Sequence, residues 1–371
     1  MILIDFSSIL HRKIFTSITS MKPRKEDGKY VTEDFIDYTK HLILEELFDI
    51  VRVFGPRFGE LVICLDNKSP EGYWRKDVLR SYKAKRSKNR QESDIDFQSV
   101  WPHLNALTEA IKLLPWKCVE VHRAEADDII LVLADEFTKF NPSLDYTKTE
   151  VLIHSPDKDM IQAQFGTDSI LQYSALTNKW VVPETKSTDM EDWLLEHICL
   201  GDVSDEVPKI VDWTEFSDNF KEHLTKNKIA ADNPFEFKEL PKECKIKLLQ
   251  EFNIRKTNRA GDELEKDVYK DMRFGATTLT KAIKKHGSLD NFLDSHPLYR
   301  EHYDRNKTLV LTEGIPDYIR DAIIENYEKA PVEYLHHEFE EYLRDNNLSG
   351  LIMEIPQSIT SARGELTADD W

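Results

Sequence analysis

Three short apolar runs, each leading to an aspartate, constrain the fold of this chain most. The runs are residues 2–4, 61–65 and 150–154. Runs of this length and composition are typical of buried strands. Asp5 and Asp66 directly follow the first two runs, and Asp157 follows the third after a Ser-Pro pair. Because the carboxyl ends of parallel strands form one edge of an open α/β sheet, we expect these three aspartates to converge.

A further group of acids opens a predicted helix. Glu125-Ala126-Asp127-Asp128 precedes apolar residues at helical spacing. Carboxylates in a first helical turn are favoured by free backbone N–H groups and by the macrodipole, which is a purely structural explanation for them. Strands that alternate with helices predict an α/β fold with a mainly parallel central sheet and flanking helices. That fold would bring this helix start to the same edge as the strand-end aspartates.

So many carboxylates in one crevice repel one another unless protons or cations intervene. Oxygen ligands without interleaved His or Cys favour Mg²⁺ or Mn²⁺ over zinc. The alternative is a set of separate, solvated loop acids, which repetition at three strand ends disfavours. The candidate metal ligands are Asp5, Asp66, Glu125, Asp127, Asp128, Asp157, Asp159, Asp202 and Asp205.

The segment after Asp66 is the most basic part of the chain. Residues 75–90 hold eight basic side chains and one acid, with Tyr73, Trp74 and Tyr82 interleaved. A charge run is usually a solvated face, but this one follows a candidate metal ligand, where a polyanion would need positive guidance. The basic residues are Arg75, Lys76, Arg80, Lys83, Lys85, Arg86, Lys88 and Arg90.

Composition narrows the class of protein. The net charge of −18 over 371 residues argues against uniform coating by nucleic acid, although it allows a local basic surface. The four cysteines form no C-x-x-C pair, so neither a zinc site nor a disulfide framework is indicated. The sequence has no signal-peptide pattern and no apolar run long enough to span a bilayer. We therefore expect a soluble, cytoplasmic protein that is monomeric.

Other patterns divide the chain. Thr32 can cap a helix that runs to about Phe54 and ends at Gly55-Pro56, and helices are predicted near 97–114 and 192–200. We expect a metal-binding core over residues 1–211 with a basic bridge near 73–92, a polar insertion over 212–271, a helical region over 272–350, and a flexible tail over 351–371.

The helical region contains a candidate duplex-binding element. Thr277 or Thr278 can start a helix, Gly287 can end it, and Ser288 can cap the next. Two helices joined by a glycine turn suit a nucleic-acid backbone, while an ordinary pair of helices remains the alternative. The candidate contacts are Gly275, Thr277, Lys281, Lys284 and Lys285.

The ordered motifs resemble the 5′-nuclease (flap endonuclease) family, and within it the ribonucleases H of T-even-type bacteriophages. The motifs are LIDFS at 3–7, VICLDN, GYWRKD, SYKAKR, EADD at 125, SPDKDM at 155 and GDVSDEVP at 201. The resemblance covers about residues 1–211 and 272–350. It departs from the family pattern after Val211, where the polar stretch separates the two halves of the duplex-binding element.

This resemblance implies roles for individual residues. Asp5, Asp66, Glu125 and Asp127 match a first metal group, and Asp128 falls in the same motif. Asp157, Asp159, Asp202 and Asp205 match a second group, which implies two Mg²⁺ ions, with Mn²⁺ as a substitute. Lys83 and Arg86 match residues that contact the scissile phosphate, and Tyr82 lies beside them. A bound K⁺ at the duplex-binding element is a further implication.

The resemblance implies a Mg²⁺-dependent 5′-nuclease that removes RNA primers and short 5′ DNA flaps during phage DNA replication. Its partners would be RNA–DNA hybrid, duplex DNA and 5′-flap DNA. The alternatives are a PIN-type ribonuclease and a catalytically inactive, structure-specific DNA-binding protein. The tail ends in Trp371 among acids, which suggests docking to a replication partner such as a sliding clamp or a single-strand-binding protein.

Overall fold

A computed structural model of the chain describes residues 1–138, 150–165, 167–182, 190–210, 275–295 and 297–360. The expected polar insertion and residues 361–371 of the expected tail lie outside the described residues. The chain divides into two units, residues 1–190 with 311–371 (unit 1) and residues 191–310 (unit 2). None of the described helices combines the length and the apolar composition needed to cross a membrane.

Unit 1 is built on a six-stranded sheet with the strand order β5-β4-β1-β6-β7-β8. The strands are β1 (Ile2–Asp5), β4 (Leu61–Leu65), β5 (Lys117–Glu120), β6 (Val151–His154), β7 (Ile170–Ser174) and β8 (Lys179–Val181). All neighbouring strands pair in parallel except β7 and β8, which are antiparallel. The mainly parallel α/β sheet expected from the sequence is therefore confirmed. A separate two-stranded hairpin pairs β2 (Lys25–Glu26) with β3 (Lys29–Tyr30).

The strand order places the aspartate-bearing strands side by side. Central β1 pairs with β4 on one side and with β6 on the other. Asp5 pairs with Cys64 in this register, so that Asp66 lies just beyond it on the neighbouring strand. Asp157 follows the end of β6. The three strand-end aspartates thus belong to three adjacent strands at their carboxyl ends.

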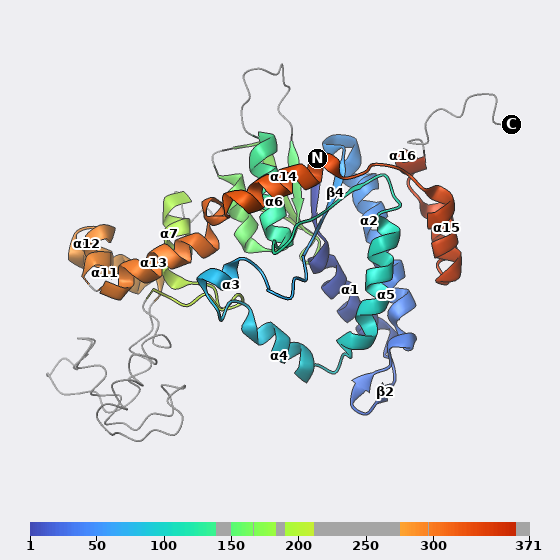
Figure 1. Ribbon diagram of the computed structural model, residues 1–371, viewed down its shortest axis with the longest axis horizontal. Helices are drawn as coiled ribbons and strands as arrows, with labels where there is room; N and C mark the ends of the chain where they lie inside the picture. Colours follow the sequence, from blue (N-terminus) through green and yellow to red (C-terminus); the bar gives the residue numbers. More distant parts are fainter. Residues whose placement is uncertain (139–149, 166, 183–189, 211–274, 296, 361–371) are drawn as a thin grey trace, which may run out of the picture. The chain divides into compact units, whose positions relative to one another are not determined.

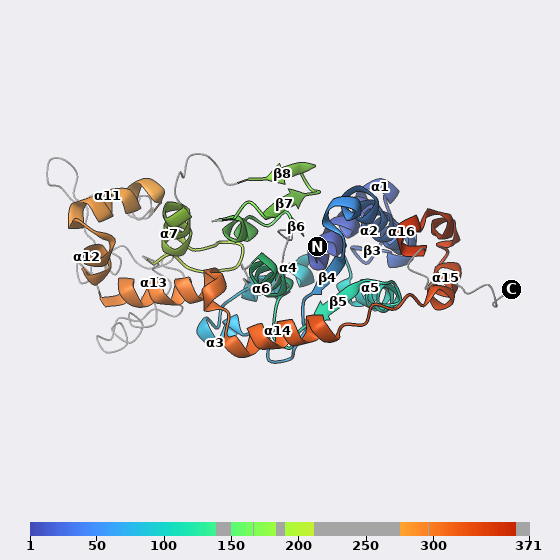
Figure 2. The same cartoon turned by 90° about the horizontal axis from the view of Figure 1, so that it is seen from above.

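Helices cover both faces of the sheet (Figures 1 and 2). One face packs against α1 (Phe6–Met21), α2 (Ile36–Phe58) and α5 (Phe97–Ile111), and the other against α6 (Ala126–Thr138) and α14 (Asp317–Lys329). Side chains alternate along β1 and so contribute to the cores on both faces of the sheet. Ile2 and Ile4 belong to the core with α1, α2 and α5, and Leu3 belongs to the core with α6 and α14.

Two elements of unit 1 were not expected from the sequence. Helix α1 follows β1 directly, with Asp5 as its N-cap residue, so the acid that indicated a metal ligand also begins a helix. Edge strand β5 was missed because its Lys-Cys-Val-Glu sequence is not an apolar run, and only Val119 of the four is fully buried.

The bounds of α2 differ from the prediction at both ends. Thr32 does not cap this helix, because it lies in the 3-10 helix η1 (Thr32–Asp34) and its hydroxyl bonds with that of Ser99. At the other end, Pro56 is accommodated in the last turn and the helix continues to Phe58. Gly59, with φ at 79°, ends the helix instead of Gly55.

The C-terminal part of unit 1 packs further than expected. After α15 (His336–Asp345), the chain forms the 3-10 helix η5 (Ser349–Glu354) and α16 (Gln357–Thr360). Leu351 and Ile359 are buried in the α1–α2–α5 core. The expectation of a flexible tail from residue 351 is therefore wrong for residues 351–360, because these apolar side chains find partners in α2 that sequence periodicity did not reveal.

Unit 2 contains helices α7 (Met190–Leu200), α11 (Ala276–His286), α12 (Leu289–Asp294) and α13 (Pro297–Val310), drawn in Figure 2. Its core joins Cys199 and Ile210 to Leu279, Phe292 and Leu293. The predicted turn between α11 and α12 is confirmed. Gly287 ends α11 in the left-handed region, and the Ser288 hydroxyl accepts the backbone N–H of Asn291.

Candidate metal centre

We call the ends of β1, β4 and β6, together with the start of α6, the carboxylate edge, which carries Asp5, Asp66, Asp127 and Asp157. Asp5 lies at its centre, and both of its carboxylate oxygens accept hydrogen bonds. Only 8% of its surface is exposed. Its Oδ1 accepts the backbone N–H of Ser8 at 3.0 Å, and its Oδ2 accepts the Ser155 hydroxyl at 3.0 Å. Burial, together with the charges of Asp66 and Asp157, raises the pKa of Asp5 to about 6 against these hydrogen bonds.

Asp66 connects β4 to the helix that carries Asp127. Its Oδ1 accepts the backbone N–H of Ala126, the first residue of α6, at 2.8 Å. Its Oδ2 accepts the Ser7 hydroxyl at 2.5 Å. The free N–H of a first helical turn thus anchors this carboxylate, which fixes the start of α6 beside the ends of the strands.

Asp127 joins the same group of acids. Burial raises the pKa of Asp127 well above its ordinary value, and the charges of Asp157, Asp5 and Glu125 raise it further, while Lys83 opposes them. The sequence-predicted carboxylates Asp5, Asp66, Asp127 and Asp157 are therefore close enough to perturb one another. Mutual repulsion of this kind is relieved by a bound cation.

Asp157 and Asp159 lie at the start of the 3-10 helix η2 (Lys158–Gln164). Asp157 caps this helix by accepting the backbone N–H of Asp159 at 2.9 Å. From β7, the Gln172 side chain donates to the backbone carbonyls of Ser155 and Asp157 at 2.9 and 2.6 Å. Gln172 and the two serines at positions 7 and 155 position the acidic loops, and sequence motifs alone did not indicate them.

Glu125 is bound by three side chains of the basic segment, which we define as residues 73–92. Lys83 Nζ lies 2.5 Å from Oε1, while Arg75 Nη1 and the Tyr82 hydroxyl donate to Oε2 at 3.1 and 2.9 Å. All four residues are buried. Glu125, a sequence-predicted metal ligand, therefore also connects the basic segment to the metal site.

The sequence placed Asp128 among the candidate metal ligands and Arg75 among the candidate nucleic-acid contacts, and in the structure the two side chains form an ion pair with each other. Asp128 is fully buried, and its Oδ2 accepts the Trp74 indole N–H at 3.0 Å and the Glu125 N–H at 2.9 Å. Arg75, 5% exposed, pairs with Asp128 Oδ1 at 2.8 Å. The buried Asp128–Arg75 pair thus connects the basic segment to the Glu125 loop.

The basic segment forms α3 (Arg75–Val78) and α4 (Ala84–Glu92), on the side of the sheet where β1 runs into α1 (Figure 1). Lys83 precedes α4 with φ at 53°, a left-handed conformation that is uncommon for a residue with a side chain. Lys76 is half-buried, and four further predicted contacts are exposed, namely Arg80, Lys85, Arg86 and Arg90. The side chain of Lys88 lies outside the described residues.

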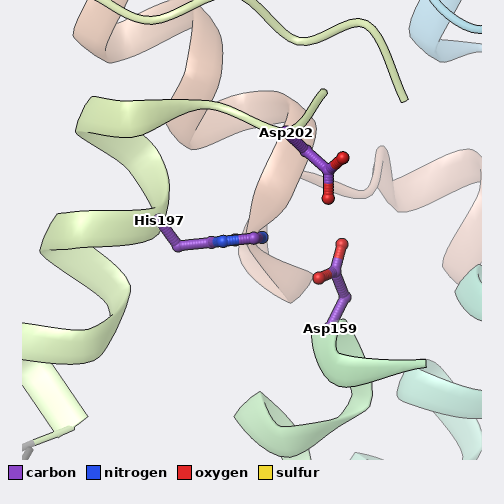
Figure 3. A group of neighbouring side chains, drawn as sticks. All are labelled: Asp159, His197 and Asp202. Atoms are coloured by element: carbon purple, nitrogen blue, oxygen red, sulfur yellow. The ribbon is translucent and has the colours of Figure 1, made fainter. Parts of the chain in front are cut away.

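Unit 2 carries the remaining predicted acids and a histidine that the sequence analysis missed. His197, in the last turn of α7, and Asp202 offer a ring nitrogen and a carboxylate oxygen within 4.8 Å of each other. Figure 3 shows the side chains of His197 and Asp202. Against the effect of burial, backbone N–H groups of Ser204 and Asp205 lower the pKa of Asp202, and His197 adds to this effect.

The predicted duplex contacts lie on or beside α11. Gly275 is the residue before this helix, and the side chains of Thr277, Lys281, Lys284 and Lys285 are exposed. Lys284 and Lys285 occupy the last turn, where the macrodipole favours cations. Their positions are compatible with either a nucleic-acid contact or an ordinary solvated face.

Comparisons with known proteins agree with this geometry. A family model described as "5'-3' exonuclease, N-terminal resolvase-like domain" matches residues 1–190. Ribonuclease H of Enterobacteria phage T4 is 30% identical over 210 residues, which cover 56% of this chain and 62% of that protein. A 5'-3' exonuclease of Mycoplasmopsis pulmonis is 24% identical over 161 residues, which cover 43% and 44%. The chain thus matches less than two thirds of the length of either relative.

Among solved structures, the D15 protein of T5, co-crystallised with metal ions, is similar over 93% of this chain and 97% of its own, with 12% identity and a TM-score of 0.49. The match of the family model spans half of the chain and includes the whole carboxylate edge of unit 1. The chain therefore belongs to the 5'-3' exonuclease family with an N-terminal resolvase-like domain, as the sequence motifs indicated.

Proposed function

We propose that this protein is a divalent-metal-dependent 5′-nuclease that acts as a 5′-3′ exonuclease and flap endonuclease. The observation that carries the proposal is the convergence of four carboxylates, Asp5, Asp66, Asp127 and Asp157, at the ends of adjacent strands and the start of α6. Two of them have raised pKa values because burial and neighbouring acids disfavour their charged forms. Such a group is stabilised by cations, which relieve the repulsion among its charges.

The donor set fits a hard cation. The four side chains offer only oxygen atoms, which suits Mg²⁺, or Mn²⁺ in its place. When bound, a pair of such ions activates water and stabilises the attacking and leaving oxygens of a phosphodiester displacement. In this assignment the carboxylates hold the metal and none of them is the nucleophile.

The basic segment would supply charge to the substrate. Arg86 is exposed on α4, and Lys83 lies at the N-terminus of the same helix. We assign both to neutralising the scissile phosphate, since cations aimed at developing negative charge lower the barrier. Tyr82 holds Glu125 through its hydroxyl, so we assign it a positioning role beside Lys83.

On the strength of the family resemblance alone, we assign Asp157, Asp159, Asp202 and Asp205 to a second metal position. His197 extends the donor set with a nitrogen beside Asp202. A mixed nitrogen and oxygen set favours Mn²⁺ or another transition ion more than an all-oxygen set does, so this position should be less selective for Mg²⁺.

The proposed substrates are RNA–DNA hybrid and 5′-flap DNA, processed during removal of RNA primers in phage DNA replication. The similarity to ribonuclease H of phage T4 supports RNA–DNA hybrid as a substrate. Exposed lysines on α11 would contact the duplex backbone, with K⁺ as a candidate ion at the same helix. We propose that the protein acts as a monomer.

A cleavage assay on a 5′-flap duplex tests this function. We expect cleavage in Mg²⁺ and none in EDTA, and we expect Asp127→Asn to abolish cleavage while flap binding stays equal or becomes tighter, because a repelling charge is removed. Cleavage of single-stranded RNA alone would indicate a PIN-type ribonuclease. Metal-independent binding without cleavage would indicate a structure-specific binding protein.

Docking to a sliding clamp or a single-strand-binding protein is a separate proposal for residues 361–371, which lie outside the described residues. Glu365, Asp369 and Asp370 accompany Trp371, a combination suited to a basic groove with an aromatic pocket. Deleting 361–371 should leave cleavage by the isolated protein unchanged and should weaken stimulation by the partner. Equal stimulation of both forms would rule the proposal out.

A further inference from the structure

An aromatic cluster lies in unit 1 where α1 and α5 meet. Trp101 stacks on Phe97 with ring centroids 5.8 Å apart, and His11 meets Trp101 edge-on at 5.7 Å. All three rings are partly exposed, and both Phe97 and Trp101 pack against the core below them. The cluster is thus a fixed aromatic surface that the metal site does not use.

Two cations from other elements lie over the same tryptophan. Lys68 Nζ, from the loop after Asp66, is 4.2 Å from the Trp101 ring centroid. Arg90, near the end of α4, lies 6.0 Å from it. Neither forms an ion pair with a carboxylate in the part of the chain that the structure describes. The ring attracts each cation individually, but the two cations repel each other.

Two like charges over one aromatic ring are stabilised when an anion lies near both of them. An aromatic face beside paired cations is the combination that binds a nucleotide, because the base stacks and its phosphate is neutralised.

The cluster also lies beside the proposed reaction site. Burial lowers the pKa of His11 to about 4, and the charges of Arg90, Asp66, Arg86 and Lys68 all act on its ring. His11 is consequently neutral at physiological pH and behaves as an aromatic surface. The cluster therefore lies within electrostatic reach of a candidate metal ligand, Asp66, and a candidate phosphate contact, Arg86.

We propose that Trp101, supported by His11 and Phe97 and flanked by Lys68 and Arg90, is a stacking platform for an unpaired nucleobase of the substrate strand. This inference rests on the proposed nuclease function and adds a base-recognition site to it. Base stacking tolerates any sequence, because every base has an aromatic face. The platform would hold the strand next to the metal site and leave the sequence free to vary.

Binding without cleavage tests the platform. The probe is a single-stranded oligonucleotide labelled with fluorescein at its 3′ end, measured by anisotropy in EDTA. Trp101→Leu keeps an apolar side chain at this position and removes the aromatic face, and should weaken binding about tenfold, within the range for loss of one stacked base. Trp101→Phe retains a ring and should bind within about twofold of the wild type.

A matched control and a matched probe make the result specific. Trp180 in β8 is 46% exposed and packs against Phe54 and Tyr173, with no cation over its ring among the described residues, so Trp180→Leu should bind like the wild type. On an oligonucleotide whose nucleobases are replaced by abasic sites, Trp101→Leu and wild type should bind equally. Equal weakening on both probes, or no weakening on either, would overturn the platform.

The binding test of the platform and the cleavage test of the proposed nuclease function can fail independently. If flap cleavage requires Mg²⁺ but Trp101→Leu binds both probes like the wild type, the platform is wrong and the nuclease function stands. If the protein cleaves no substrate but loses base-dependent binding with Trp101→Leu, the nuclease function fails and the platform stands. Thermal unfolding of both Trp101 variants verifies that each is folded.

Discussion

At the scale of single residues, the acids of the proposed metal site lower the stability of the metal-free protein. The folded pKa of Asp5 is about 6, against an ordinary value of 3.8, because burial and neighbouring acids disfavour its charge. The folded protein therefore binds more protons than the unfolded chain between these values. The free energy of unfolding consequently falls as pH rises through this window and stays low above it.

We predict that Asp5→Asn stabilises the metal-free protein at neutral pH. The two pKa values differ by about 2, which corresponds to at most about 3 kcal/mol. The asparagine oxygen can still accept the Ser8 N–H, so the start of α1 is retained. Urea unfolding in EDTA should show a gain at pH 7 that disappears near pH 4.

The matched control is a partly exposed acid whose pKa shifts in the opposite direction. Hydrogen bonds from Arg24 lower the pKa of Asp34, so Asp34→Asn should lose stability at neutral pH. A loss of stability in Asp5→Asn at pH 7 would contradict the account of Asp5. Added Mg²⁺ should raise the unfolding temperature of the wild type and should raise that of Asp5→Asn less, since a proposed ligand charge is missing.

Lys83 and a divalent cation should compete for Glu125. Lys83 Nζ contacts Glu125 Oε1 in this structure, at the carboxylate that the family motif assigns to a metal. Removing a cation from a buried carboxylate leaves a negative charge that favours another cation. We predict that Lys83→Ala binds Ca²⁺ or Mg²⁺ about tenfold more tightly, equivalent to about 1.4 kcal/mol, while its cleavage rate falls.

Calorimetric titration of metal into each variant measures this competition independently of turnover. Arg86→Ala is the control, because Arg86 is exposed on the same segment, whereas Lys83 is buried against Glu125. Its metal affinity should stay close to that of the wild type. Unchanged or weaker metal binding by Lys83→Ala would exclude the competition.

At the scale of elements, the sequence predicted most strands and helices but not their packing partners. The apolar runs gave β1, β4 and β6, and helical spacing gave α6, because burial imposes those patterns. The basic segment was expected to contact phosphate, with a solvated face as the alternative, yet Arg75, Tyr82 and Lys83 are buried around Glu125. A run of charges does not reveal which members meet an opposite charge from another element.

The turn after α7 gives a prediction for one element. Gly201 has φ at 64°, and a Cβ there would lie 2.3 Å from the backbone oxygen of Val207. Because a backbone atom cannot move aside cheaply, Gly201→Ala should destabilise unit 2 by about 2 kcal/mol or more. It should also displace Asp202, whose backbone pairs with Val207 in this turn.

Gly275→Ala is the matched control for that substitution. Gly275 precedes α11 with an extended backbone, and an added Cβ there would meet nothing within 4 Å. Thermal unfolding should therefore show a lowered unfolding temperature for Gly201→Ala and a nearly unchanged one for Gly275→Ala. Equal unfolding temperatures in the two variants would show that the turn does not need glycine.

At the scale of the whole molecule, the order of the sequence did not predict which segments fold together. Residues 272–350 were expected to form one helical region, but the chain is divided at Val310, and residues from Leu311 onward belong to unit 1. Ile319 and Ile323 of α14 belong to the α6 core, and Phe339 and Leu343 of α15 belong to the α2 core. Helical periodicity predicts which face of a helix is apolar, but it does not predict which distant segment that face packs against.

The last prediction follows from this division. Unit 1 should fold without unit 2, provided that its C-terminal helices are retained. In one variant, residues 191–310 are replaced by a Gly-Ser linker, and in the other the chain stops after Met190.

The linker variant keeps Ile319, Ile323, Phe339 and Leu343 in the core. The chain that stops after Met190 exposes the surfaces that these residues cover, at a cost of about 1.5–3 kcal/mol for each buried side chain. The summed cost of about 6–12 kcal/mol is comparable to the whole stability of a typical domain. Circular dichroism and thermal unfolding should therefore show a cooperative transition for the linker variant only. A cooperative transition in the chain that stops after Met190 would show that residues 311–360 are dispensable to the core, and would contradict the assignment of those helices to unit 1.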